Sequence, residues 1–236
     1  MSLPATACVI GAGGLGCPAL SSLCAAGIEA LSIVDHDVVE GHNLQRQVLY
    51  GTADVGRFKV DAAAHRLRAR RHDLLITTRR VRLEPDDADT FVASLPPGTV
   101  LLECTDSPEL KFAINDAALR YHVPLVIGAA LGWQGQALAV VAGHACYRCI
   151  YEAPPPAEAV PTCAQAGVVG AGVGLTGHLM AHLALRLHSA TAETAGRLMS
   201  LDLLAGTVRT LQPSRRDDCP ACGAPGVRPA AAPAAS

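Results

Sequence analysis

The sequence predicts an α/β protein, in which a mostly parallel sheet carries helices on both faces and is extended by antiparallel strands in the second half. Three observations predict this class. Short aliphatic runs alternate with segments of helical period, which is typical of strand–helix–strand units. The first apolar run breaks into a glycine-rich turn and continues as a helix. Half of the 236 residues are hydrophobic, so the chain can bury a core.

The elements follow in order along the chain. In the first half we expect strands at 5–10, 30–35, 74–81, 99–104 and 124–131, and helices at 15–27, 58–72, 86–95 and 108–122. The rhythm changes after Gly132. We expect later strands at 136–142 and 198–211, a small-residue helix at about 167–188, and an irregular loop at 152–163. The end, 226–236, is low in complexity and is expected to be disordered.

Charge and hydropathy exclude several classes of protein. A formal net charge of −2 gives no electrostatic reason for a nucleic-acid or membrane-surface partner. No apolar stretch reaches the ~20 residues of a membrane span, and no basic region precedes an apolar one at the N-terminus. We therefore predict a cytoplasmic protein whose nine cysteines are thiols or metal ligands rather than a disulfide framework.

The glycine turn predicts a nucleotide site. Gly11, Gly13 and Gly16 match G-x-G-x-x-G directly after a strand, where the backbone can approach a phosphate at a helix N-terminus. Asp35 ends the second strand, at the spacing of an acidic residue that accepts hydrogen bonds from a ribose. These features indicate a Rossmann-like half and leave NAD, FAD and ATP open. An ordinary tight turn with a surface aspartate is the plain alternative.

The residues after the second strand favour a triphosphate. A polar cluster follows it, consisting of Asn43, Arg46, Gln47 and Lys59, where a dehydrogenase has no general need for such side chains. With the ordered motifs "GAGGLG", "DHD…NLQRQ", "GRFK", "ECTDS", "CYRCIY", "PTCAQAGVVG" and "CPACG", the chain resembles the ThiF/MoeB/HesA family over Cys8 to Gly223. Members of this family are bacterial relatives of ubiquitin-activating enzymes and adenylate the C-terminal carboxylate of a small protein or peptide.

The resemblance implies roles for individual residues. Nucleotide binding would involve Gly11, Gly13, Gly14, Gly16, Asp35, Asp37, Asn43, Arg46, Gln47, Lys59 and Asp106. The catalytic residues would be Arg46, Lys59, Asp106 and Cys163, with Asp106 holding Mg²⁺. Fixed cations and a metal would offset the charge that develops when a carboxylate attacks the α-phosphorus of ATP. Taken singly, Arg46 and Lys59 could be surface ion-pair partners, and Asp106 could be a helix N-cap.

Two features depart from the family pattern. An N-terminal arginine that reaches the ATP of the other subunit is expected in the family, whereas the first Lys or Arg here is Arg46. We therefore expect a homodimer with independent ATP sites, packed through the first half and the 167–188 helix. The usual "CTDN" is "CTDS", so Ser107 replaces an amide.

The cysteines divide by spacing. Cys146 and Cys149 form one C-x-x-C, Cys219 and Cys222 form another, and four thiolates from two such pairs suit tetrahedral Zn²⁺. The stretch between the pairs exceeds a compact zinc ribbon, and the resemblance implies that the fold brings them together into a structural zinc-binding region. A redox role for either pair is the alternative.

The other cysteines have separate interpretations. Cys163 precedes a predicted helix, and the resemblance implies a thioester or acyl-disulfide with the activated partner, a free thiol being the alternative. The remaining cysteines fall on strands or packed helix faces and are expected in the core, namely Cys8, Cys17, Cys24 and Cys104.

The resemblance implies ATP-dependent adenylation of a small ubiquitin-like sulfur-carrier protein with an exposed C-terminal glycine, for sulfur transfer in biosynthesis. One adenylation domain would cover 1–225, with a nucleotide-binding half at 1–132 and a substrate and zinc half at 133–225. Two alternatives stay open: an NAD- or FAD-dependent oxidoreductase, and a non-catalytic family member that binds a partner.

Overall fold

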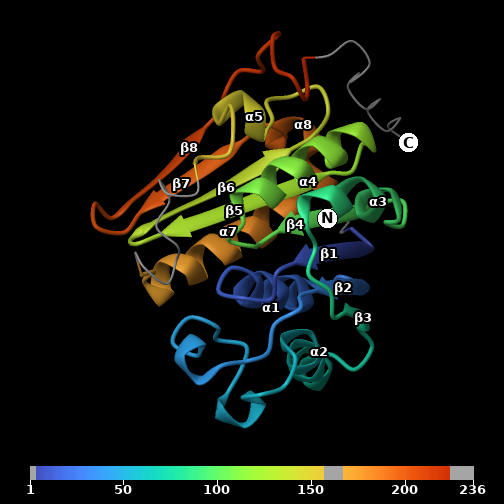
Figure 1. Ribbon diagram of the computed structural model, residues 1–236, viewed down its shortest axis with the longest axis vertical. Coiled ribbons are helices and arrows are strands. Elements are labelled where there is room, and N and C mark those ends of the chain that lie inside the picture. Colours follow the sequence, from blue (N-terminus) through green and yellow to red (C-terminus); the bar gives the residue numbers. More distant parts are fainter. Residues whose placement is uncertain (1–3, 157–166, 224–236) are drawn as a thin grey trace.

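One eight-stranded sheet runs through the computed structural model, which describes residues 4–156 and 167–223 (Figure 1). The strands are β1 (Thr6–Ile10), β2 (Ala30–Val34), β3 (Leu75–Arg79), β4 (Thr99–Glu103), β5 (Leu125–Leu131), β6 (Gln134–Val140), β7 (Leu198–Asp202) and β8 (Thr207–Leu211). Their order across the sheet is β3-β2-β1-β4-β5-β6-β7-β8. Neighbours are parallel from β3 to β5 and antiparallel from β5 to β8, so the predicted α/β class with an antiparallel extension is confirmed.

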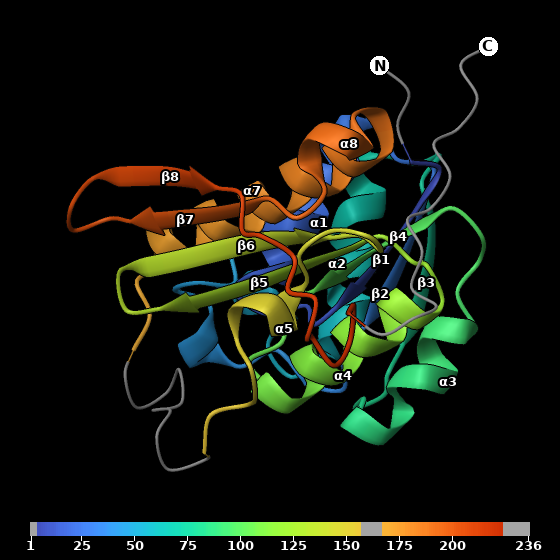
Figure 2. The same ribbon diagram turned by 90° about the horizontal axis from the view of Figure 1, so that it is seen from above.

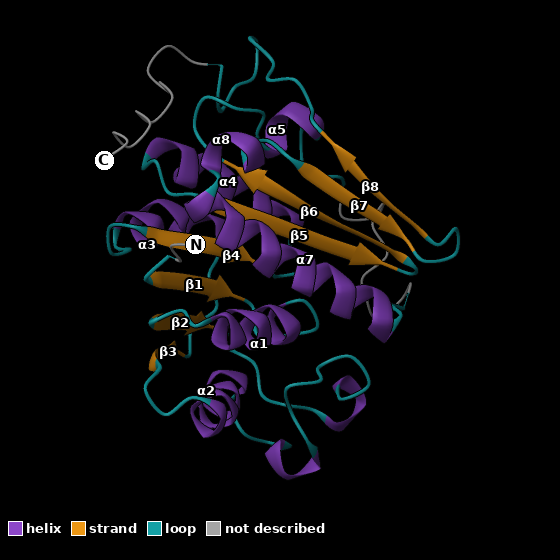
Figure 3. Cartoon of the chain, turned by 180° about the vertical axis from the view of Figure 1, so that it is seen from behind, coloured by secondary structure: helices purple, strands orange, loops and turns teal. Residues whose placement is uncertain are grey.

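Helices cover both faces of the sheet (Figures 2 and 3). They are α1 (Gly16–Ala26), α2 (Lys59–Arg70), α3 (Ala88–Ala93), α4 (Pro108–Arg120), α5 (Tyr147–Ile150), α7 (Gly170–Ser189) and α8 (Thr191–Thr194), with 3₁₀ turns η1 (Gly41–Asn43), η2 (Thr52–Asp54) and η3 (Pro85–Asp87). One core cluster joins α1, α2 and α7 to the sheet, and a second joins α3, α4 and α5 to the opposite face. β4 is buried along its whole length because it has a helical layer on each side, which explains its unbroken aliphatic run.

Glycine and serine set the ends of two helices that border the site. α1 ends at Gly27, whose φ of 98° is the left-handed conformation that glycine adopts without strain. α4 begins after Ser107, whose hydroxyl accepts a hydrogen bond from the backbone N–H of Leu110 at 3.2 Å. The helix predicted at 86–95 is the turn η3 followed by α3.

The single strand predicted at 198–211 is wrong, because the chain turns within it. β7 and β8 pair as an antiparallel hairpin, with Asp202 opposite Thr207. The Asp202 carboxylate accepts the backbone N–H groups of Leu204 and Ala205 at 3.0 Å, and Gly206 adopts a φ of 63°. The Asp and Gly of "DLLAG" therefore close a turn that hydropathy alone does not reveal.

The topology creates one switch point. β2 and β3 lie on one side of β1, and β4 and β5 lie on the other, so the loops after β1 and β4 leave the sheet side by side. In open α/β sheets this crevice at the carboxyl ends is where ligands bind. Within the described residues, no helix has the length and apolarity to cross a membrane.

Candidate active site

Two glycines of the turn after β1 are required by packing. Gly11 has a φ of 88°, and a Cβ there would lie 3.0 Å from the carbonyl carbon and oxygen of Cys104. A Cβ on Gly16 would lie 1.9 Å from the Gly11 carbonyl oxygen. Neither contact involves a flexible side chain, so these glycines let the turn close against itself and against the loop after β4.

The other two glycines of the turn differ from each other. A Cβ on Gly14 would lie 2.6 Å from Cγ1 of Val173 on α7, so this glycine lets α7 approach the turn. A Cβ on Gly13 would meet only Nε2 of Gln47, at 3.7 Å. Since no described neighbour of Gly13 requires a glycine, its missing side chain leaves room beside the turn for a ligand.

Two buried side chains hold this turn in shape. Asp35, 9% exposed, accepts the backbone N–H of Ala12 at 2.7 Å and that of Asp37 at 2.8 Å. The Tyr50 hydroxyl donates to the Ala12 carbonyl oxygen at 2.8 Å and lies 3.2 Å from that of Lys59. Burial raises the pKa of Tyr50, which keeps the hydroxyl a donor. The sequence motifs do not point to Tyr50, although an aromatic hydroxyl in a buried segment is a usable signal because it needs a partner.

Lys59 begins α2 and points back toward the end of β2. Its Nζ lies 2.7 Å from Oδ2 of Asp37, whose Oδ1 lies 3.0 Å from Nε2 of His36. Burial raises the pKa of Asp37, but the hydrogen bond and charge of Lys59 lower it more, so the carboxyl titrates below its usual range. Lys59 does form an ion pair, as the alternative supposed, but only Asp37 lies at the surface: the Asp37 side chain is 49% exposed and the Lys59 side chain 7%.

The loop from η1 carries three further candidates. Asn43 is buried and its Oδ1 accepts a hydrogen bond from Arg46 at 2.8 Å, while its Nδ2 donates to Glu40 at 3.1 Å. No carboxylate among residues 4–156 and 167–223 pairs with Arg46, whose aliphatic carbons lie 3.7 Å from the position of a Cβ on Gly14. Gln47 is 3% exposed, and its Oε1 has no hydrogen-bond partner in the described chain. A buried amide atom without a partner beside the glycine turn fits a polar ligand.

Asp106 lies in the loop after β4. Its neighbour Thr105 has a backbone nitrogen 3.1 Å from the position of a Cβ on Gly11, so the loop borders the glycine turn. Asp106 is exposed and its carboxylate has no partner among the described residues. The alternative that Asp106 caps α4 is wrong, because Ser107 is the N-cap.

Four cysteines from distant parts of the chain meet on the α4 side of the sheet. The Sγ atoms of Cys146, Cys149, Cys219 and Cys222 all lie within 4.8 Å of one another. Three pairs of sulfurs are separated by 3.9, 3.7 and 3.3 Å. For Zn–S bonds of about 2.3 Å, the sulfurs of a tetrahedral site lie about 3.8 Å apart, so this donor set fits zinc. The predicted meeting of the two C-x-x-C motifs is confirmed.

The cysteine site favours thiolate formation at one position. Burial raises the pKa of Cys219, but hydrogen bonds from the backbone N–H groups of Cys222 and Ala221 lower it more, to about 7. Burial raises the pKa of Cys222 to about 12. No disulfide occurs in the part of the chain that the structure describes. A metal that is positively charged would stabilise all four thiolates together.

The remaining cysteines have two outcomes. The core assignment is confirmed for the four that the structure describes, all at most 6% exposed: Cys8, Cys17, Cys24 and Cys104. Burial raises the pKa of Cys8 and of Cys17 to about 12, so they are poor nucleophiles. Cys163 lies outside the described residues, and its proposed role stays a prediction.

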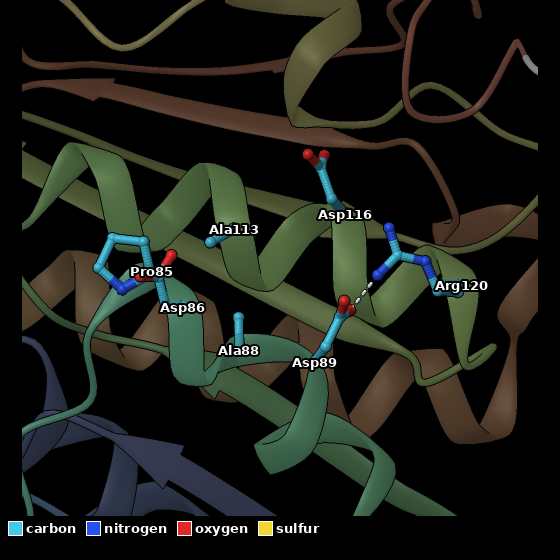
Figure 4. A pocket seen from close by; sticks show the side chains of 7 residues that line it. All are labelled: Pro85, Asp86, Ala88, Asp89, Ala113, Asp116 and Arg120. Atoms are coloured by element: carbon cyan, nitrogen blue, oxygen red, sulfur yellow. Dashed lines mark hydrogen bonds and ion pairs between the residues drawn. The ribbon is translucent and has the colours of Figure 1, made fainter.

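A shallow hollow of about 300 Å³ lies elsewhere, between η3, α3 and α4 (Figure 4). Its lining is Pro85, Asp86, Ala88, Asp89, Ala113, Asp116 and Arg120. Figure 4 shows the ion pair of Arg120 with Asp89 at one end. Because α4 runs from the carboxyl end of β4 back toward the amino end of β5, this hollow lies away from the glycine turn.

Several known proteins are similar to this chain in sequence. The chain is 39% identical over 218 residues to the adenylyltransferase and sulfurtransferase MOCS3 of Bos taurus, covering 91% of this chain and 47% of that protein. It is 39% identical over 228 residues to the sulfur carrier protein adenylyltransferase of Thermus thermophilus, covering 93% of this chain and 82% of that protein. The chain thus spans about half the length of its MOCS3 and Uba4 relatives.

Solved structures support the fold. The crystal structure of E. coli MccB with ATP superposes with a TM-score of 0.80 at 18% identity, covering 93% of this chain and 67% of that one. At this identity the likeness concerns the fold alone. The ThiF family model matches residues 4–221, from just before β1 to the second cysteine pair, which it reaches at Cys219, and the chain therefore belongs to the ThiF family.

Proposed function

We propose that the chain is an ATP-dependent adenylyltransferase that activates the C-terminal carboxylate of a small ubiquitin-like sulfur-carrier protein. The observation that carries this proposal is the meeting, at one switch point, of the glycine turn, the cations Arg46 and Lys59, and the carboxylate of Asp106, which is unpaired among the described residues. Family membership and the printed activities of the relatives support it. The NAD or FAD alternative has no comparable support.

The nucleotide would bind along the carboxyl edge of the sheet. Asp35 has two carboxylate oxygens that each accept one backbone N–H, and each retains a lone pair for a ribose hydroxyl. The backbone beside Gly13 and the N-terminus of α1 would face the phosphates. Asn43 and Gln47 would donate amide N–H groups to the phosphates, whereas the unpartnered Oε1 of Gln47 is an acceptor and would take a hydrogen bond from an O–H or N–H donor of the bound complex.

Adenylation requires a carboxylate to approach an anionic phosphate. Arg46 lays its aliphatic carbons beside Gly14, and no carboxylate of the described residues pairs with its guanidinium, so its charge would be available to offset the charge that develops at the α-phosphorus. Lys59 shares its charge with Asp37, which also fixes its direction. Mg²⁺ held by Asp106 would neutralise the phosphates and favour departure of pyrophosphate. Cys163 would act after this step: its thiolate would attack the carbonyl carbon of the acyl-adenylate, forming a thioester and releasing AMP.

The other parts of the proposal concern architecture. A structural Zn²⁺ would tie the segment after β6 to the segment after β8 through the four cysteines. Residues 1–225 would form one adenylation domain, with the halves 1–132 and 133–225 sharing the continuous sheet. The chain would form a homodimer that packs through its first half and α7. It would be located in the cytoplasm.

The test is ATP–pyrophosphate exchange with candidate carrier proteins. We expect exchange that depends on the intact C-terminal glycine of one carrier, and none with the same carrier shortened by that glycine. A chain that binds ATP but exchanges pyrophosphate with none of the small ubiquitin-like carriers encoded beside it would contradict the proposal and favour a non-catalytic, partner-binding role.

A further inference from the structure

A buried ion pair lies beneath the loop that carries Asp106, and no step of the proposed chemistry uses it. Glu103, the last residue of β4, is 0% exposed, and Lys111, in the second turn of α4, is 4% exposed. Their side chains form a direct ion pair. Both charges lie between β4 and α4, in a layer whose other buried side chains are mostly apolar, and there a buried pair contributes little net stability compared with well-packed apolar side chains. The pair therefore calls for a reason other than stability.

The pair holds the backbone on one side of Asp106. Glu103 accepts the backbone N–H of Thr105 at 3.0 Å and also the Thr105 hydroxyl. Lys111 donates to the carbonyl oxygen of Thr105 at 2.7 Å. Both backbone polar groups of Thr105 are thus bound by the two members of one ion pair.

The same network continues on the other side of Asp106. The Thr105 hydroxyl oxygen accepts the backbone N–H of Ser107 at 3.3 Å, and the Ser107 hydroxyl accepts the N–H of Leu110 at 3.2 Å. The hydrogen bonds run from Lys111 through Glu103, Thr105 and Ser107 back into α4. Asp106 is the residue of this loop whose carboxylate is exposed and unpaired in the described chain.

We propose that Glu103 and Lys111 are positioning residues, whose buried ion pair fixes the direction of the Asp106 carboxylate toward a divalent cation bound with the nucleotide. This inference rests on the proposed function, since it deepens the role of Asp106. When a hydrogen-bonding partner of a metal ligand is replaced, the affinity for the metal commonly falls roughly 10- to 100-fold. The hydrogen-bonded frame matters because Asp106 is exposed and its carboxylate has no hydrogen-bond partner among the described residues.

The experiment measures ATP binding by calorimetry over a series of Mg²⁺ concentrations and again in EDTA. The main variant is the double substitution Glu103→Met and Lys111→Met, which removes the pair without leaving one buried charge alone. Thr105→Val is the second variant, because it retains the pair and removes only the bridging hydroxyl. The control is Asp89→Asn with Arg120→Met, which removes an ion pair at the far end of α4.

We expect the double variant to need about 10- to 100-fold more Mg²⁺ for half-maximal ATP binding, with unchanged binding in EDTA. Thr105→Val should shift the Mg²⁺ dependence in the same direction, and the control should match the wild type. An unchanged Mg²⁺ dependence in both folded variants would overturn the inference, and so would an equal loss of binding in EDTA. If the double variant does not fold, Thr105→Val alone decides in the same way. Wild-type binding that is independent of Mg²⁺ would also overturn the inference.

The failure of the proposed function gives a different result. In that case wild type and variants alike support no pyrophosphate exchange, while the Mg²⁺ dependence of ATP binding still separates the double variant from the control. The two proposals are therefore tested by separate readouts.

Discussion

Gly13 and Gly16 should respond in opposite ways to the addition of one methyl group. The Cβ of Gly16→Ala would lie 1.9 Å from the Gly11 carbonyl oxygen, and that backbone cannot move without opening the turn. We expect a loss of about 1–3 kcal/mol of stability or more. The Cβ of Gly13→Ala meets Nε2 of Gln47 at 3.7 Å, an ordinary contact, and the φ of Gly13 lies outside the left-handed range. The lower entropy of the unfolded chain should leave Gly13→Ala unchanged or more stable by up to about 1 kcal/mol.

Gly13→Ala should weaken nucleotide binding even though it does not lower the stability of the fold. If the phosphates lie against the backbone there, a methyl group would displace them and weaken charge-assisted hydrogen bonds worth about 1.5–3 kcal/mol. We therefore expect ATP affinity to fall about 10- to 100-fold in Gly13→Ala, since every 1.4 kcal/mol is tenfold.

Thermal unfolding and ATP calorimetry on the same preparations test both parts. Gly174→Ala is the control, because a Cβ there meets no described atom within 4 Å and α7 favours alanine over glycine. Wild-type ATP affinity in a folded Gly13→Ala would show that the phosphates do not approach this part of the turn. A Gly16→Ala protein as stable as the wild type would refute the packing argument.

Four further predictions concern chemistry, metal and pH. Asp106→Asn should lower pyrophosphate exchange about 100-fold or more while the melting temperature stays within a few degrees, because the side chain is exposed and does not cap α4; full exchange would contradict its metal role. Cys163→Ala should leave exchange largely unchanged, since any thioester follows adenylation; lost exchange in a folded variant would reverse this order. Metal analysis of protein purified without chelator should find about one Zn²⁺ per chain. The substitution Cys146→Ser should reduce both the zinc content and the melting temperature. A wild-type protein that is stable and contains no metal would exclude the zinc site. Asp54, 1% exposed, is buried, which raises its pKa, but hydrogen bonds from the backbone and Arg66 lower it more. The ionised Asp54 therefore stabilises the fold at neutral pH, and this contribution is lost as the pH falls below about 4, the pKa in the unfolded chain, and through the lower pKa of the folded state. In urea unfolding, the free energy of unfolding of Asp54→Asn should therefore fall less steeply with decreasing pH than that of the wild type.

Local patterns in the sequence were sufficient for much of this protein. The alternation of strands and helices, the turn at Gly11 to Gly16 and the end of β2 at Asp35 each depend on neighbours a few residues away, so residue order alone predicts them. The two C-x-x-C spacings also predicted a four-thiol site, although only the resemblance implied that the pairs meet. The Asp and Gly turn between β7 and β8 is also a local signal, although hydropathy alone predicts one continuous strand there.

Tertiary structure decided what depends on contacts between distant segments. Cys146 meets Cys219 at 3.7 Å because β6, β7 and β8 lie side by side, and no short-range pattern carries that distance. The four glycines of the turn are indistinguishable in the sequence. In the fold, Cys104 lies against Gly11 and Val173 against Gly14, whereas a Cβ on Gly13 would have room. Glu103 and Lys111 are charges on apolar faces, and only the packing of α4 on β4 shows that they pair. The physical reason is that residue types set local conformation, whereas the strand order, which brings the loops after β1 and β4 side by side at the switch point, sets which side chains share one site.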